Sequence, residues 1–305
     1  MRSGATGSAA LRAEALGARL PPLVVAADRV AATVLQGVHG RRRSGQGDAF
    51  WQFRPFLPGD PAARVDWRQS AKSDRLFVRE TEWEAAQTVA LWRDASPSMA
   101  WRSGPAVPLK RERAELLLLA TASLLLRGGE RVRLVGSGAS GRNHAGRAGL
   151  QAVADALNRA TPPPPRTDAD AAGGEPGVPP FDPTLPRHAR AVLFGDFLSP
   201  LEDIRRSVSA LASLPLRGHL VQILDPAEET LPYRGRIRFE GLEAEAPSLV
   251  PRVERVREVY EERLRLHRAG VAAIAAAAGW GFLTHRTDQP AGQVLLALWQ
   301  ALAPE

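Results

Sequence analysis

The stretch Thr88-Val89-Ala90-Leu91-Trp92-Arg93-Asp94-Ala95-Ser96-Pro97-Ser98 decides how the rest of this chain is interpreted. Residues 88–92 form a nearly continuous apolar run, which is typical of a strand covered on both faces of a sheet. An acid and two serines at alternate positions, Asp94, Ser96 and Ser98, follow directly, and core packing does not explain them. Carboxylate and hydroxyl oxygens are the ligands that Mg²⁺ and similar hard cations require. We therefore expect a cation-binding turn at the end of a buried strand.

Outward from this stretch, predicted strands and helices alternate to the end of the chain. The periodicity predicts strands at 88–92, 131–135, 191–194, 220–224 and 280–283, and helices at 109–127, 151–159, 200–214, 252–278 and 292–302. A further segment, 236–240, alternates like an edge strand. Alternation of this kind predicts an α/β fold, with a doubly wound, mostly parallel sheet and helices on both faces.

A second acid, Asp196, follows the predicted strand 191–194. In doubly wound sheets, ligands bind beyond the carboxyl ends of the strands, where the strand order reverses. If the order is 3-2-1-4-5-6, with a short third strand within 140–145, the strand ending at Asp94 lies beside the strand ending at Asp196. The carboxylates of Asp94 and Asp196 and the hydroxyls of Ser96 and Ser98 would then converge on one spot.

The N-terminal third differs in composition from the rest. Residues 1–40 are predicted to be a helical segment, with two short helices separated by Pro21-Pro22. Residues 41–86 interleave aromatic with basic side chains among turn-forming prolines, which favours a small β-rich subdomain with buried aromatic residues. Residues 87–305 form the predicted α/β domain, interrupted by a flexible loop rich in proline and glycine at about 161–186.

Composition limits the class of protein. The chain has 305 residues, and 44% hydrophobic content is enough for a real core. It has no cysteine, which excludes disulfides and thiolate metal sites and favours a reducing compartment. Charged residues interrupt the N-terminal segment, so no signal peptide is predicted, and no apolar run approaches the ~20 residues that cross a bilayer. We expect a soluble, cytoplasmic protein without a membrane span.

The ordered motifs carry a family resemblance. Asp94-x-Ser96-x-Ser98 after the first buried strand, with Asp196 after the fourth, resembles the metal-ion-dependent adhesion site of von Willebrand factor A domains. The chain also resembles the bacterial subgroup called domain of unknown function 58, over roughly residues 37–300. The motifs that carry this second resemblance are Pro58-Gly59-Asp60, Val65-Asp66-Trp67, Leu76-Phe77-Val78-Arg79-Glu80, Asp225-Pro226-x-Glu228, Leu231-Pro232 and Tyr260.

The resemblance implies a von Willebrand factor A-like fold and a divalent cation, usually Mg²⁺. Asp94, Ser96 and Ser98 would hold the cation, Asp196 would bind it through water, and a partner's carboxylate would fill the remaining position. The usual fifth group is a threonine before the fourth strand, for which Thr161 and Thr167 are both candidates. Arg93 stands where an apolar residue is more common in the family.

The function implied is therefore adhesive and non-enzymatic. Members of the subgroup are commonly associated with MoxR-type AAA+ ATPases, so such an ATPase, or a client protein that supplies the carboxylate, is the expected partner in assembly or maturation of other proteins. The resemblance gives the metal no catalytic role, and we expect no enzyme activity.

Two alternatives belong to other classes. A hydrolase or phosphotransferase using the same metal would need a general base near Asp94. A nucleic-acid-binding protein would use Arg41 to Arg43 and the aromatic-basic segment, and the net charge of +7 is compatible with it. The distribution of charge argues against nucleic-acid binding, because the excess basic residues are almost all arginines and acids are interspersed among them. The literal G-x-G-x-x-G at 136–141 lacks an immediate helix and is interpreted as a turn, not a dinucleotide site.

Overall fold

The computed structural model describes residues 20–37, 44–58, 60, 65–73, 75–82, 86–136, 139, 141–160, 177–242 and 246–302. The chain divides into two compact units. The larger unit combines Met1–Gln36 with Gln87–Glu305, and the smaller unit is Gly37–Ala86.

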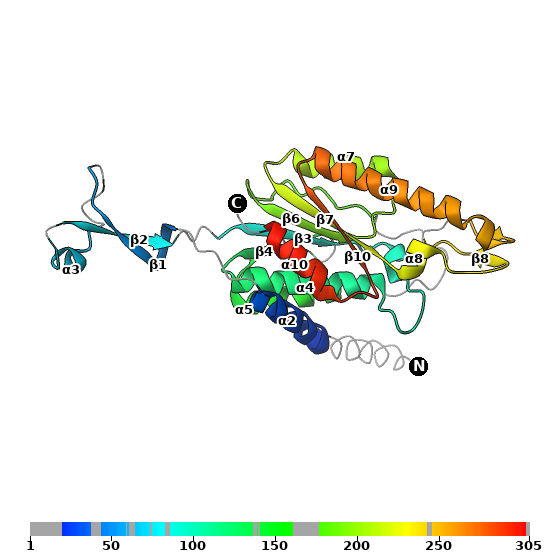
Figure 1. The fold of residues 1–305 in the computed structure, drawn as a ribbon, viewed down its shortest axis with the longest axis horizontal. Coiled ribbons are helices and arrows are strands. Elements are labelled where there is room, and N and C mark those ends of the chain that lie inside the picture. The colour runs from blue at the N-terminus through cyan, green and yellow to red at the C-terminus, as the bar shows by residue number, and fades with distance from the viewer. Residues whose placement is uncertain are drawn as a thin grey trace, which may run out of the picture. The chain divides into compact units, whose positions relative to one another are not determined.

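A six-stranded sheet forms the centre of the larger unit (Figure 1). Its strands are β3 (Thr88–Arg93), β4 (Arg131–Val135), β5 (Asn143–His144), β6 (Arg190–Gly195), β7 (Arg217–Leu224) and β10 (Gly281–Arg286), in the spatial order β10-β7-β6-β3-β4-β5. Neighbouring strands are parallel, except that the short β5 runs antiparallel to β4. Counted along the chain this is 3-2-1-4-5-6, so the predicted order is confirmed and β3 lies beside β6.

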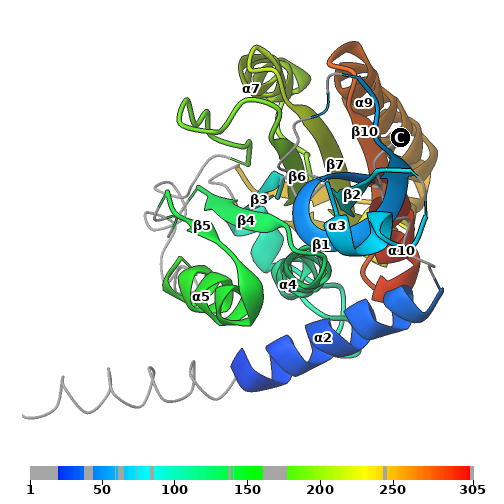
Figure 2. The same ribbon diagram turned by 90° about the vertical axis from the view of Figure 1, so that its left-hand side faces the viewer.

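Helices cover both faces of the sheet, as predicted (Figure 2). One face carries α2 (Leu20–Gly37), α4 (Lys110–Arg127), α5 (Gly146–Arg159) and α10 (Ala291–Leu302), and the other carries α7 (Leu201–Ala212) and α9 (Arg257–Ala277). Successive side chains of β3 enter opposite cores: Val89 and Leu91 pack with the first group, Ala90 and Trp92 with the second. The unbroken apolar run of this strand follows from its central place between two helical layers.

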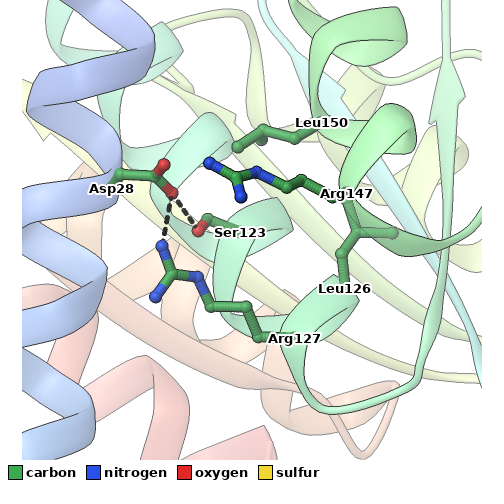
Figure 3. Close-up of a pocket in the computed structure, with 6 residues that line it drawn as sticks. All are labelled: Asp28, Ser123, Leu126, Arg127, Arg147 and Leu150. Carbon is green, nitrogen blue, oxygen red and sulfur yellow. Dashed lines mark hydrogen bonds and ion pairs between the residues drawn. The ribbon is translucent and has the colours of Figure 1, made fainter.

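The N-terminal helix α2 belongs to the larger unit. Its two prolines lie in the first turn, where a missing backbone N–H costs nothing. Ala27, Ala31 and Val34 of α2 enter the same core as α4, and Ser123 Oγ of α4 donates a hydrogen bond of 2.5 Å to Asp28 (Figure 3). The other helix predicted before the prolines lies outside the described residues.

The connections contain shorter elements. They are the 3-10 helices Pro97–Ala100 and Val253–Arg255, the short helix α8 (Pro226–Thr230), and strands β8 (Ile237–Phe239) and β9 (Ser248–Val250). The predicted edge strand at 236–240 is β8, which pairs with β9 in a separate hairpin and not with the main sheet. Helix α5 begins at Gly146, five residues earlier than the predicted 151, because Gly149 and Leu150 are also buried. Gly136 has a φ of +92° and accepts a turn hydrogen bond from Ala139 N, so the glycine-rich segment begins with a turn.

The smaller unit is a β-ribbon with one helical turn. Strand β1 (Ser44–Pro55) pairs antiparallel with β2 (Phe77–Glu82), and Asp66 caps the short helix α3 (Trp67–Ser70). The expectation that its aromatic residues are buried is wrong for Trp67, which is 66% exposed, and for Phe53, which is 36% exposed. The physical reason is that the described part of this unit, a two-stranded ribbon with one helical turn, presents no second layer that covers these side chains.

None of the helices that the structure describes is long and apolar enough to cross a membrane.

Candidate metal centre

The four predicted metal-site residues come together where β3 and β6 end. Ser96 N donates a hydrogen bond of 2.8 Å to Asp94 Oδ1, and the hydroxyls of Ser96 and Ser98 lie 3.0 Å apart. Ser98 Oγ donates a bond of 2.7 Å to Asp196 Oδ2. Because β3 and β6 are parallel neighbours, their carboxyl ends place both acids at the same edge of the sheet.

The backbone conformation after β3 orients these side chains toward one another. Asp94 N donates to Phe194 O at 2.8 Å, which extends the β3–β6 ladder up to the acid. Pro97 then begins a single 3-10 turn, and Met99, fully buried, fixes that turn to the core. Arg93 points to the other side, as strand alternation predicts, and its Nε lies 3.6 Å from Glu115 of α4.

Asp94 is the group whose environment most suggests a cation. The residue is fully buried, and its Oδ2 has no hydrogen-bond partner within the described part of the chain. Burial first, and then the charge of Asp196, raise the pKa of Asp94 to about 7. A buried, unpaired carboxylate oxygen is costly unless a cation or donor compensates it. The carboxylate and the two hydroxyls form a hard-oxygen donor set, so the residues present fit Mg²⁺ or a similar ion.

Glycines leave room around that oxygen. A Cβ at Gly195 would lie 3.0 Å from Asp94 Oδ2. A Cβ at Gly177 would lie 2.8 Å from Ser199 Oγ and 3.5 Å from both Asp94 Oδ2 and Ser96 Oγ. Gly177 is the first described residue of the loop predicted at about 161–186, so this part of the loop packs beside the site.

Asp196 is held quite differently from Asp94. Its Oδ2 accepts from both Ser98 Oγ and Lys110 Nζ, the latter at 2.9 Å, and its Oδ1 accepts from Leu198 N at 3.1 Å. Both of its oxygens are therefore engaged by protein donors. This arrangement suits contact with a cation through a water molecule better than direct ligation.

Sequence reasoning missed Lys110 and Glu228 as site residues. Lys110 is the first residue of α4, fully buried, and its Nζ bridges Asp196 Oδ2 and Glu228 Oε1, the second at 2.5 Å. Burial alone would lower the pKa of Lys110, but the two carboxylates raise it above that of a free lysine. Burial raises the pKa of Glu228 even though Lys110 opposes this.

Helices α8 and α9 hold Glu228 in place. Glu228 Oε2 accepts from Asp225 N at 2.9 Å, as part of the capping of α8. Tyr260 Oη of α9 donates to the Glu228 carbonyl at 2.6 Å. The motif Asp225-Pro226-x-Glu228 and Tyr260 therefore meet beside the predicted site.

Comparison with known proteins now identifies the family. The family model described as "Protein of unknown function DUF58" matches residues 52–270. The chain belongs to the DUF58 family. The predicted resemblance to domain of unknown function 58 is confirmed.

The relatives of this DUF58 chain carry no functional description. Uncharacterized proteins of Mycobacterium bovis and of Mycobacterium tuberculosis are each 26% identical to it over 260 residues, which is 84% of this chain and 80% of theirs. Among solved structures, the conserved hypothetical protein BatB from Bacteroides thetaiotaomicron is 10% identical and covers 71% of this chain and 98% of its own. Its TM-score of 0.36 is too low to assign a fold.

The candidates for a fifth ligand, Thr161 and Thr167, both lie outside the described residues. Within the described ranges, no three histidine, cysteine or acidic side chains form a metal-binding group. The predicted set is of another kind, since it contains two carboxylates and its other members are hydroxyls.

Proposed function

We propose that this protein is a non-enzymatic, divalent-cation-dependent protein-interaction module built on a von Willebrand factor A-like domain. The observation that carries the proposal is Asp94 Oδ2, a buried carboxylate oxygen without a hydrogen-bond partner in the described chain, placed beside the serine hydroxyls at the end of a central strand. The 3-2-1-4-5-6 strand order supports the fold assignment, since it brings the two predicted acids to the same edge.

Each residue has a distinct task in this proposal. Asp94, Ser96 and Ser98 would hold the cation, and Asp196, already engaged by protein donors, would approach it through water. Bound Mg²⁺ supplies a positive centre that accepts a partner's carboxylate. The protein's own residues fix the position of that centre and supply part of its neutralising charge.

The partner proposed is a MoxR-type AAA+ ATPase or a client protein that offers an acidic side chain. This part rests on the family resemblance together with the proposed carboxylate-binding chemistry. The role that follows is assembly or maturation of other proteins in the cytoplasm.

The site's other charged groups favour binding over turnover. A hydrolase would need a base free to take a proton from a nucleophile. Around this site, Lys110 forms ion pairs with both Asp196 and Glu228, so these groups already have partners. A metal-dependent phosphotransferase remains the enzymatic alternative, and its turnover would depend on Asp94.

The nucleic-acid alternative has less support. Arg41 to Arg43 lie outside the described residues. Three described surface arginines pair with acids on the same helix, as Arg205–Glu202, Arg206–Asp203 and Arg265–Glu262. The positive charge of these three is therefore compensated locally and is less available to phosphates.

Calorimetric titration of Mg²⁺ tests the metal-binding proposal. The wild-type protein should bind the ion and Asp94→Ala should not, because the variant lacks the unpaired carboxylate oxygen. Asp155→Ala is the matched control, since Asp155 lies on α5, pairs with Gln151 and contributes nothing to the site. Equal Mg²⁺ binding by wild type and Asp94→Ala would refute the assignment of the metal site.

Capture of a cognate MoxR-type ATPase, with Mg²⁺ or with a chelator, tests the partner. Retention that requires both Mg²⁺ and Asp94 supports the adhesive role. Retention that is indifferent to chelation would show that the cation does not mediate the contact.

A further inference from the structure

Lys110 is unusual because lysine is rare in this chain and because its side chain is buried. The chain has 40 basic residues, and Lys72 and Lys110 are the only lysines among them. Lys72 is exposed, whereas the side chain of Lys110 is 1% exposed and lies against the proposed metal site. A lysine ammonium is compact and carries three donors on a flexible stem, while an arginine is a larger planar fork. A small buried cation that must contact two carboxylates from different elements therefore calls for lysine.

The contacts of Lys110 determine what Asp196 can do. Lys110 Nζ and Ser98 Oγ both donate to Asp196 Oδ2, and Leu198 N donates to Oδ1. Asp94 has the opposite arrangement, with Oδ1 accepting from Ser96 N and Oδ2 without a partner in the described chain. The two acids are therefore not equivalent: Asp94 has an oxygen without a partner in the described chain, whereas both oxygens of Asp196 accept hydrogen bonds from the protein.

We propose that Lys110 is a positioning residue that keeps Asp196 out of direct contact with the bound cation and thereby leaves a coordination position for the partner's carboxylate. The inference rests on the proposed function, since it concerns the same cation. With a single carboxylate in direct contact, the cation retains more of its positive charge for a third acid. Removing Lys110 takes away the charged donor to Asp196 Oδ2 and leaves the Ser98 hydroxyl, and Asp196 then competes for the position meant for the partner.

The ion pair is anchored on both sides. Lys110 Nζ contacts both Asp196 and Glu228, and Glu228 is itself fixed by Asp225 N and Tyr260. The position of the ammonium beside Asp196 is therefore set by several elements of the fold.

The test uses a variant that removes the positioning contact without changing the local net charge. Lys110→Met alone leaves Asp196 and Glu228 buried without their cation, which is strongly destabilising. The double variant Lys110→Met/Glu228→Gln removes one positive and one negative charge together, so any change in cation affinity does not come from net charge. Lys72→Met is the matched control, since it removes the chain's exposed lysine.

Mn²⁺ is the probe, because it reports both affinity and the water molecules in its first coordination shell through water-proton relaxation. We expect the double variant to bind Mn²⁺ about tenfold more tightly than wild type, with fewer bound waters, because Asp196 joins the first shell. A lysine with a purely structural role would, on removal, weaken binding or leave it unchanged. Unchanged or weaker binding with unchanged hydration would overturn the inference.

A second variant keeps the test decisive if the double variant does not fold. In Asp196→Asn, the hydration of bound Mn²⁺ should equal that of wild type, because this residue does not touch the cation. An altered hydration number would show direct contact and overturn the inference. If wild-type protein binds neither Mn²⁺ nor Mg²⁺, the proposed function itself fails, which is distinct from a failure of the Lys110 inference alone.

Discussion

Asp94 lowers the stability of the folded state, and the reason lies in its burial. Its pKa is raised from 3.8 to about 7, mainly because burial disfavours the charged form. For an acid whose pKa is higher in the folded state, stability is greatest below the unfolded pKa and is lost as pH rises through the folded pKa. Above pH 7 the full penalty applies.

Asp94→Asn should therefore be more stable than wild type at pH 8 without divalent cations, by an amount on the order of 3 kcal/mol. The amide oxygen can still accept from Ser96 N, so the turn is preserved. Urea unfolding measures the difference. Added Mg²⁺ should raise the wild-type midpoint and leave the variant unchanged. A variant that is less stable than wild type at pH 8 would contradict the burial argument.

Gly177 gives a second prediction at the residue scale. A Cβ at this position meets Ser199 Oγ at 2.8 Å and approaches Asp94 Oδ2 and Ser96 Oγ at 3.5 Å. Gly177→Ala should weaken Mg²⁺ binding by about tenfold, because the methyl group narrows the space beside Asp94. Gly104→Ala is the control, since a Cβ there meets nothing within 4 Å. Calorimetry on both variants, with circular dichroism to verify folding, decides the prediction.

Sequence alone could locate Asp94 and Asp196 but not the Lys110 ammonium that binds Asp196. Asp94 and Asp196 each follow an apolar strand, and an acid that directly follows an apolar run is easily recognised in the sequence. Lys110 precedes Arg111-Glu112-Arg113, so the sequence pattern there indicates an exposed helix start. Its burial depends on Asp196 and Glu228, which arrive from distant elements. The rarity of lysine in the chain was the available signal.

At the scale of elements, β7 and the turn before β10 illustrate how closely the layers pack. Gly218 of β7 lies under the ring of Trp280, and a Cβ there would come within 2.3 Å of the ring carbons. Trp280 is itself 5% exposed and belongs to the core shared by α7 and α9. The contact leaves no room for a larger residue on this part of β7.

Gly218→Ala should therefore destabilise the larger unit by about 1–3 kcal/mol, because the indole ring or the strand must shift. Gly292→Ala in α10 is the comparison, since a Cβ there meets nothing within 4 Å and alanine favours the helix. That variant should be neutral or slightly stabilising. Thermal or urea unfolding of the two variants should show opposite or clearly unequal shifts.

Element types were predictable where one local pattern sufficed. The apolar run of β3 and the stripe of α4 predicted their elements to within a residue or two. The pairing of β8 with β9 was not predictable from the sequence. Each paired segment is only three residues long, which is too short to show a clear alternation of apolar and polar residues. The exposure of Trp67 and Phe53 was also missed, since burial depends on a covering layer that local sequence does not encode.

At the scale of the whole molecule, His285 links stability to pH. It lies in β10 at 3% exposure, and its Nε2 has no partner within the described residues. Burial, followed by the charge of Arg113, lowers the pKa of His285 to about 4. The unfolded chain takes up a proton at this residue below about pH 6.5, whereas the folded protein does so only near pH 4. Its contribution is complete above pH 6.5 and is lost as pH falls.

His285→Gln should consequently lose less stability than wild type between pH 7 and pH 4.5, by up to about 3 kcal/mol. Comparing the two proteins across the same pH series cancels the opposite trend expected of Asp94. Denaturant unfolding at each pH supplies the measurement. Parallel stability curves for wild type and variant would show that His285 does not titrate differently on folding.

The proposed site also has a consequence for the order in which the chain folds. Its contacts join residues far apart in sequence: Lys110 to Asp196 across 86 positions, Ser98 to Asp196 across 98, and Lys110 to Glu228 across 118. Closing such long loops is entropically costly, and contacts of high sequence separation slow folding. The cluster is complete only once β6, β7 and α8 are in place. A partner that binds there would recognise finished chains and pass over nascent or partly folded ones.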